Sequence, residues 1–83
     1  MKIRVRFFAS LREALGTGET VELPDGATVA QLRDMLLSRG GAYAERLAPG
    51  RAVRCAVDQA LCDELTVLVD GAEAAFFPPV TGG

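Results

Sequence analysis

The stretch that decides the fold reads TVAQLRDMLL over residues 28–37. Its residues Thr28 and Gln31 have the spacing of a capping box, in which two side chains bond to the free backbone N–H groups at a helix start. Apolar residues follow at helical spacing and share one face, namely Val29, Leu32, Met35 and Leu36. The stretch therefore predicts one main amphipathic helix, which Gly40-Gly41 is expected to end.

Two segments of alternating polarity precede this helix. They cover residues 2–8 and 19–23, and in both the apolar side chains fall at every second position, as in strands with one buried face. The inward side chains are expected to be Ile3, Val5, Phe7, Val21 and Leu23. The same alternation leaves Phe8 on the polar side of its strand, which makes this outward aromatic residue a candidate contact residue.

Turn and cap residues separate these elements. Ser10 and Glu13 have capping-box spacing and predict a single short helical turn, which Gly16 ends. The run Pro24-Asp25-Gly26 predicts a turn before the main helix. After that helix, residues 42–51 read as a surface connection with room for one helical turn.

Three further strands are predicted in the second half of the chain. They cover residues 52–57, 60–62 and 73–77. Neighbouring residues of a strand point to opposite faces, so Phe76 and Phe77 cannot both be inward. One of the two is expected in the core and the other exposed.

The order of elements is a hairpin, a helix and then further strands. This order predicts an α+β protein with a mixed sheet and one main helix packed on one face. A β-grasp arrangement fits it, and so do other α+β sandwiches. A chain of 83 residues is long enough for one domain, expected over residues 1–77. Pro78 and Pro79 lack backbone N–H groups and end the pairing, so residues 78–83 are expected to form a flexible extended tail that ends in Gly82-Gly83.

Composition and charge limit the function classes. The formal net charge is -2 and the basic residues are scattered, which argues against nucleic acid and an anionic membrane surface as partners. Arg4 and Arg6 interrupt any N-terminal apolar run that could serve as a signal peptide or membrane span, so a cytoplasmic location is expected. Asp and Glu residues form no close pair within apolar sequence, so no metal site is expected.

The two cysteines, Cys55 and Cys62, are too few for a secreted disulfide scaffold and are expected to be thiols. Cys55 alternates with valines, which favours a small buried apolar residue. Cys62 sits at the end of a short predicted strand. An alternative role for its thiol is to form an oxidised bond with a sulfur-bearing C-terminus of another chain.

The two terminal glycines, Gly82 and Gly83, carry the strongest functional indication. Glycine has no Cβ, so its backbone can thread a narrow site on another protein. A terminal carboxylate has a pKa near 3.5, so it is ionised at neutral pH and must be activated, for example as an acyl adenylate. The chain has no GxxxxGK[ST] loop and Lys2 is its only lysine, so ATP is expected to be bound by a separate activating partner, with no cofactor held by this chain.

Three segments together resemble a known family. They are Arg6-Phe-Phe-Ala-Ser-Leu-Arg-Glu13, Val57-Asp-Gln-Ala-Leu61 and Asp70-Gly-Ala-Glu-Ala-Ala-Phe-Phe-Pro-Pro-Val-Thr-Gly-Gly83. They resemble the small, sulfur-carrying subunits of molybdopterin synthases, which have a ubiquitin-like β-grasp fold, and the resemblance spans essentially the whole chain. The run FFPPVTGG is its specific part. The chain departs from the family pattern at Asp58, Ala72 and Ala74.

The resemblance implies a chemistry and a set of partners. An adenylating enzyme would activate Gly83 with ATP, and a sulfur donor such as a cysteine desulfurase or a rhodanese-like protein would convert it to a thiocarboxylate. The tail, with Gly82 beside the reactive group, would then enter the large catalytic subunit in an assembly of two small and two large subunits. There its sulfur would convert cyclic pyranopterin monophosphate to molybdopterin. The chain would be the sulfur-donating part of this sulfurtransferase complex and would not be catalytic alone.

The resemblance also implies which residues bind the partners. An exposed apolar patch that docks against the large subunit and the activating enzyme would comprise Phe8, Leu61 and Phe77. The tail residues that enter the partner would be Pro78, Pro79, Val80 and Thr81. The independent strand pattern of residues 2–8 also directs Phe8 outward.

Three alternative functions are consistent with parts of the sequence. The chain could carry sulfur for another pathway, such as thiamine or a thiolated nucleoside, since the fold alone does not choose the product. It could also be a ubiquitin-like protein modifier, whose diglycine forms isopeptide bonds, or an interaction domain without tail chemistry. Lys2, Arg4 and Arg6 form a basic strand face, which either is solvated or helps to dock an acidic partner.

Overall fold

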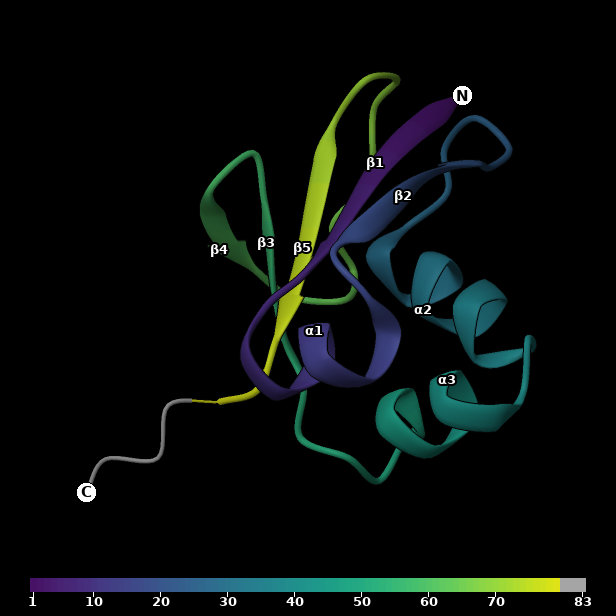
Figure 1. Cartoon of the computed structure of the whole chain (residues 1–83). Coiled ribbons are helices and arrows are strands. Elements are labelled where there is room, and N and C mark those ends of the chain that lie inside the picture. Colours follow the sequence, from purple (N-terminus) through teal and green to yellow (C-terminus); the bar gives the residue numbers. More distant parts are fainter. Residues whose placement is uncertain (80–83) are drawn as a thin grey trace.

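A computed structural model describes residues 1–79 of the chain. In this range five strands form one sheet, and three helices lie on one of its faces (Figure 1). The elements follow the chain as β1 (Lys2–Phe7), α1 (Ala9–Leu15), β2 (Gly18–Glu22), α2 (Val29–Leu37), α3 (Gly41–Leu47), β3 (Arg54–Val57), β4 (Ala60–Cys62) and β5 (Glu73–Phe77).

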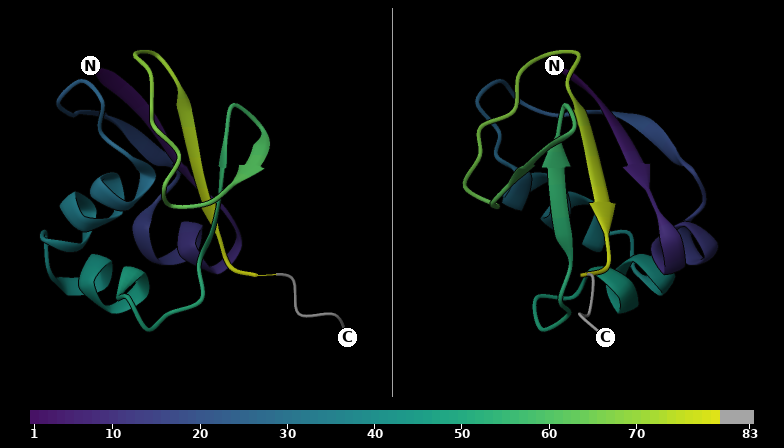
Figure 2. Two further views of the ribbon diagram at one scale, coloured as in Figure 1. Left: turned by 180° about the vertical axis from the view of Figure 1, so that it is seen from behind. Right: turned by 90° about the vertical axis from the view of Figure 1, so that its left-hand side faces the viewer.

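The sheet has the strand order β2-β1-β5-β3-β4. The first and last strands, β1 and β5, pair in parallel at its centre, and every other pair is antiparallel. The sheet is therefore mixed, as predicted. The two views of Figure 2 show that no helix of residues 1–79 lies on its second face. The last strand of the chain thus lies in the middle of the sheet, and the helix-free face is open for other contacts.

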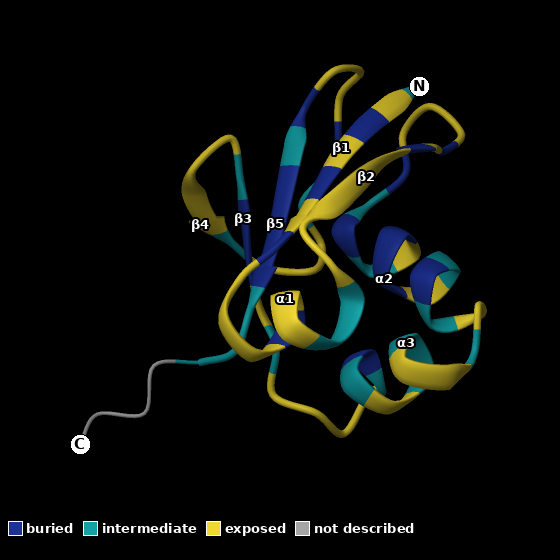
Figure 3. Cartoon of the chain, in the orientation of Figure 1, coloured by how far each residue is buried: buried dark blue, intermediate teal, exposed yellow. Residues whose placement is uncertain are grey.

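The core lies between the sheet and the helices. The strand residues expected to point inward are buried, as Figure 3 shows along β1 and β5. Phe7 of β1 and Phe76 of β5 stand opposite each other in register and stack, with 6.2 Å between their ring centroids. The ring edge of Tyr43 from α3 packs on Phe7 at 6.4 Å. Of the two consecutive phenylalanines in β5, Phe76 is the core residue and Phe77 is half-buried on the other face.

Helix α2 begins as the capping box predicts. The backbone N–H of Gln31 donates to Thr28 Oγ1 at 3.3 Å, and the backbone N–H of Thr28 donates to Gln31 Oε1 at 2.8 Å. Val29, Leu32 and Leu36 are fully buried, while Met35 on the edge of the same face is half-buried. The local sequence is therefore sufficient to fix both the start of this helix and the face that it presents to the sheet.

Other local predictions were wrong. Ser10 and Glu13 form no capping box, because α1 starts two residues earlier than this pair predicts and Phe8 occupies the N-cap position without a side-chain bond. Helix α2 ends at the C-cap Ser38, and Gly40 is instead the N-cap of α3. The connection after α2 thus contains a seven-residue helix rather than one turn, because Leu47 at its end is fully buried.

A buried arginine, not predicted from the sequence, joins α2 to α3. Arg33 is 7 % exposed, and its guanidinium donates to the carbonyl oxygens of Leu47, Ala48 and Arg51 at 2.8, 2.7 and 3.0 Å. Its Nη1 lies 3.4 Å from the carboxylate of Glu64. One side chain thus satisfies backbone acceptors at the end of α3 and in the turn after it. None of the helices in residues 1–79 has the length and apolarity needed to cross a membrane.

Candidate docking surface and tail root

The candidate site begins where β5 ends. Phe77 is the last strand residue, and Pro78 and Pro79 follow it in a half-buried, non-strand conformation. Because β5 pairs with β1 on one side and with β3 on the other, the point at which the chain leaves the sheet is held by both neighbours. The predicted tail residues Val80, Thr81, Gly82 and Gly83 lie outside the described residues.

An apolar strip runs across the helix-free face next to this point. The pairing register places Leu61 of β4 opposite Ala56 of β3, and Ala56 opposite Ala75 of β5. Phe77 lies two residues after Ala75 and therefore on the same face. Phe8 continues the extended backbone of β1 (φ −129°, ψ 161°) and also faces this side. We define the apolar strip by these five residues, Phe8, Ala56, Leu61, Ala75 and Phe77.

Exposure within the strip is uneven. Leu61 is 72 % exposed and Phe8 36 %, whereas the small Ala56 and Ala75 form a nearly buried floor between the larger side chains. The Arg6 guanidinium lies 5.3 Å from the centre of the Phe8 ring and so flanks the strip with positive charge. Leu61, Phe8 and Phe77, predicted from separate segments, are thus on one face. Large apolar side chains gathered on an open face are typical of a protein interaction site.

The hairpin that presents Leu61 is tied to the centre of the sheet by Asp58. Asp58 and Gln59 both have positive φ, 49° and 70°, which suits a tight two-residue connection between β3 and β4. The Asp58 carboxylate accepts a hydrogen bond from the Glu73 N–H at 3.0 Å, and the Asp58 N–H donates to the Glu73 carbonyl oxygen at 2.9 Å. The acidic residue at this position therefore has a structural role in fixing the hairpin.

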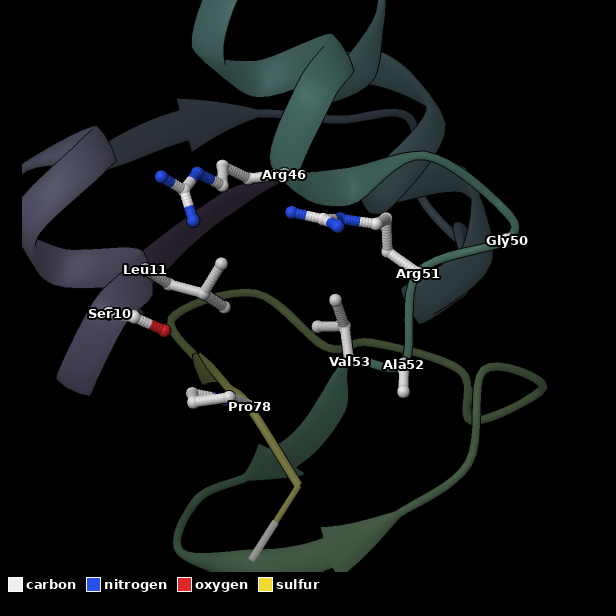
Figure 4. A pocket seen from close by; sticks show the side chains of 8 residues that line it. All are labelled: Ser10, Leu11, Arg46, Gly50, Arg51, Ala52, Val53 and Pro78. Atoms are coloured by element: carbon white, nitrogen blue, oxygen red, sulfur yellow. The ribbon is translucent and has the colours of Figure 1, made fainter. Parts of the chain in front are cut away.

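A cleft of about 260 Å³ lies beside Pro78 (Figure 4). The side chains of Arg46 and Arg51 extend along one wall, and Leu11, Val53 and Pro78 form an apolar floor. Neither guanidinium pairs with a carboxylate within residues 1–79. Two guanidinium groups above an apolar floor can bind a carboxylate or phosphate group. This cleft was not predicted from the sequence, because only the fold brings Leu11 and Pro78 beside the two arginines.

A second group of exposed apolar residues lies on the segment before β5. Leu65, Val67 and Val69 are 80, 58 and 63 % exposed. The segment forms one isolated bridge, between Val67 and Thr28, and backbone hydrogen bonds tie it to the start of α2, but it is not a strand. The part of the chain that the structure covers holds no cluster of three or more potential metal ligands.

Comparisons with known proteins agree with this arrangement. The sequence model of the ThiS family matches residues 5–83. The chain is 43 % identical over 81 residues to the molybdopterin synthase sulfur carrier subunit of Escherichia coli (strain K12), covering 98 % of this chain and 99 % of that protein. It superposes with a TM-score of 0.82 on SAMP1 from Haloferax volcanii, at 26 % identity and with all of both chains covered. A Helicobacter pylori complex of subunits 1 and 2 of molybdopterin-converting factor contains a similar chain, with a TM-score of 0.71, 27 % identity and full coverage of both chains.

Proposed function

The chain belongs to the ThiS family, and from this premise we propose that it is the sulfur carrier subunit of a molybdopterin synthase. One observation carries the proposal: the apolar strip lies at the root of a diglycine tail that emerges from the central strand. The strip provides a docking surface, and the tail provides a reactive end that a partner can engage at the same time. The 43 % identity to the Escherichia coli sulfur carrier subunit supports the choice of pathway.

The chemistry resides in the C-terminal carboxylate of Gly83. Because this carboxylate is ionised at neutral pH, an adenylating partner must first join it to the α-phosphorus of ATP, with pyrophosphate as the leaving group. A sulfur donor of the persulfide type then displaces AMP to form an acyl disulfide. A second thiol attacks the donor's sulfur in this bond, which leaves a thiocarboxylate on Gly83 and a disulfide between the donor and that thiol. Within the synthase, this sulfur passes to cyclic pyranopterin monophosphate. Each chain delivers one sulfur, so two deliveries complete one dithiolene.

The role of the folded domain is to position the C-terminal carboxylate relative to the apolar strip. Phe77 belongs to the docking strip, and Pro78 and Pro79 follow it directly, so the distance from the strip to the reactive carboxylate is set by six residues. Six extended residues span up to about 20 Å. A partner that covers Leu61, Phe8 and Phe77 would therefore receive Gly83 in a site within that reach. Glycine at the last two positions leaves room for the backbone in a narrow passage.

The arginine cleft provides a second, charged contact beside the tail. Arg46 and Arg51 lie next to Pro78, so a partner that binds the tail also passes over them. We propose that an acidic side chain of the large subunit occupies this cleft. A carboxylate bound between the two guanidinium groups would fix the orientation of the partner, which the apolar strip alone would not do.

The test of the function uses the full chain with an untagged C-terminus. Incubation with the adenylating enzyme, ATP and a sulfur donor should raise the intact mass by the exchange of one oxygen for sulfur, and the product should form molybdopterin when mixed with the large subunit. A chain without Gly83 should gain no sulfur but unfold at the same urea concentration, because the tail follows the last strand. Asp34→Asn, at an exposed residue of α2 outside both the apolar strip and the arginine cleft, serves as the matched control.

The possible outcomes separate the alternatives. Sulfur gain without molybdopterin formation would assign the chain to another sulfur-transfer pathway. Heavier covalent conjugates on a blot, formed only when Gly83 is present, would indicate a protein modifier. Sulfur retained by the chain that lacks Gly83 would contradict the mechanism.

A further inference from the structure

The two cysteines of the chain lie directly opposite each other in the β3–β4 hairpin. The register pairs Cys55 with Cys62, and their sulfur atoms are 3.2 Å apart. Both are free thiols in the structure. Cys55 also lies 3.4 Å from the carbonyl oxygen of Cys62. The sequence alone did not predict that the two cysteines are close, because their distance depends on the strand register.

The geometry points to a modification site: we propose that Cys55 and Cys62 form a reversible intramolecular disulfide across β3 and β4. Residues directly opposite in an antiparallel pair have Cα atoms roughly 4.5 to 5.5 Å apart, which falls within the range of about 4.4 to 6.8 Å found for disulfides. The sulfur atoms must approach by only about 1.1 Å to reach a bond length near 2.05 Å. Side-chain rotation can supply this movement without a change of register.

The two thiols have different environments and therefore different roles. Cys62 is half-buried on the edge strand, where a small oxidant can reach it, whereas Cys55 is 5 % exposed within the core. Cys62 is thus the thiol that an external reagent meets first, and Cys55 is the resolving thiol that completes the bond. Burial raises the pKa of the Cys55 thiol, so the second step is slow at neutral pH.

The oxidant is of the low-molecular-weight disulfide class. The Cys62 thiolate attacks one sulfur of the reagent, forming a mixed disulfide and releasing one reagent thiolate. The Cys55 thiolate then attacks the Cys62 sulfur and releases the second reagent thiolate. Two protein thiols are oxidised to one disulfide, one reagent disulfide is reduced to two thiols, and the two protons lost by the protein are taken up by the reagent.

The location connects this bond to the docking surface. β4 is a three-residue edge strand, and its middle residue, Leu61, points to the face opposite the cysteines. A bond between Cys55 and Cys62 would fasten this strand covalently to β3 while leaving the Leu61 side chain free. The inference concerns the hairpin itself and stands whether or not the proposed sulfur-carrier function is correct.

The experiment measures free thiols by mass. The full chain is reduced, the reductant is removed under anaerobic conditions, and the protein is incubated at low concentration with oxidised glutathione. It is then unfolded and alkylated with iodoacetamide, and its intact mass is measured by mass spectrometry. The expected product is a monomer that has lost two hydrogen atoms and accepts no alkyl group, and dithiothreitol should restore both alkylation sites. A chain that keeps two alkylatable thiols at every glutathione ratio, or gives only linked dimers, would overturn the inference.

Two single substitutions test the assigned roles. Cys55→Ala removes the resolving thiol, so Cys62 should accumulate a stable glutathione adduct. Cys62→Ala leaves only the buried thiol, which should remain unmodified over the same time. Equal adduct formation by the two variants would show that both thiols are independently accessible and would contradict the ordered pair.

Discussion

Arg33 Nε donates a hydrogen bond to the carbonyl oxygen of Leu47 at 2.8 Å, across 14 residues of sequence. The Leu47 carbonyl belongs to the last residue of α3, where no further helical turn provides a donor. The same guanidinium reaches two more carbonyl oxygens, those of Ala48 and Arg51. The short helix α3 is therefore ended and held against α2 by a side chain of α2.

We expect Arg33→Met to lower the free energy of unfolding by about 2–4 kcal/mol, because the aliphatic side chain leaves the buried Leu47 carbonyl oxygen without its donor and removes two further hydrogen bonds. Urea unfolding followed by circular dichroism measures this loss. Glu64→Gln is the matched control: Glu64 contacts the same guanidinium but is half exposed, so its replacement should cost less than about 1 kcal/mol. Similar losses in both variants would show that the ion pair, not the carbonyl contacts, carries the stability.

Gly18 at the start of β2 has no room for a side chain. A Cβ there would lie 2.0 Å from the Val5 carbonyl oxygen, and the residue has a φ of +137°. We expect Gly18→Ala to cost about 2 kcal/mol or more, since the β1–β2 pairing must shift. Gly50→Ala, where nothing lies near the added Cβ, should change stability by about 0.5 kcal/mol or less. Equal urea midpoints for the two variants would contradict the close approach.

Leu61 is the most exposed side chain of the apolar strip. We expect Leu61→Glu to weaken binding to the large subunit at least about tenfold, because an interface centre tolerates a buried charge poorly. Isothermal titration calorimetry measures the affinity, and unchanged urea unfolding checks the fold. Leu65→Glu is the control: Leu65 is 80 % exposed but lies outside the strip. Equal losses of affinity would place the docking surface elsewhere.

Arg51 tests the proposed acidic contact at the cleft. We expect Arg51→Glu to slow association with the large subunit, with the largest effect at low ionic strength, because charge at an interface steers the encounter. Stopped-flow mixing over a series of salt concentrations measures the rate. Lys2→Glu is the matched charge reversal, since Lys2 lies at the opposite end of β1 from the tail root. If both reversals slow association equally, overall charge explains the effect and the cleft does not.

Cys55 makes stability depend on pH in the alkaline range. Burial, and after it the hydrogen bond with Cys62, raises the pKa of the Cys55 thiol from 9.0 to about 12. Between these values the unfolded chain releases a proton that the folded chain keeps, so the stabilisation is complete below pH 9 and falls as the pH rises toward 12. Under reducing conditions, urea unfolding across this interval should show a steeper decline for the natural chain than for Cys55→Ala. Parallel pH profiles would argue against the raised pKa.

The sequence predicts those parts of the molecule that depend on local pattern. The capping box of Thr28, the inward row of β1 and the outward direction of Phe8 all follow from spacing within a few residues. The mixed sheet also followed from the order of elements. Capping-box spacing alone was insufficient at Ser10, because the helix begins two residues earlier than the pattern indicates.

Contacts between distant segments were beyond such patterns. The strand register places Cys55 opposite Cys62. Packing of the helices creates the cleft beside Arg46 and Arg51 and the three carbonyl contacts of Arg33. The length of α3 was underestimated because Leu47 is its only fully buried residue, so its sequence lacks the extended apolar face at helical spacing that α2 has. The tail chemistry of Gly82 and Gly83 was inferred from residue type and remains a prediction, since those residues lie outside the described range.

The central position of β5 also constrains how the molecule is made. Strand β5 is synthesised after β1 and β3, yet both need it as a neighbour. During translation the N-terminal hairpin and the helices can form early contacts, but the sheet cannot close until residues 73–77 have left the exit tunnel. The strand that completes the sheet is also the one that carries the diglycine. A chain that stops before β5 would therefore lack both the finished docking face and the diglycine, so partners would meet a competent tail only on a fully assembled domain.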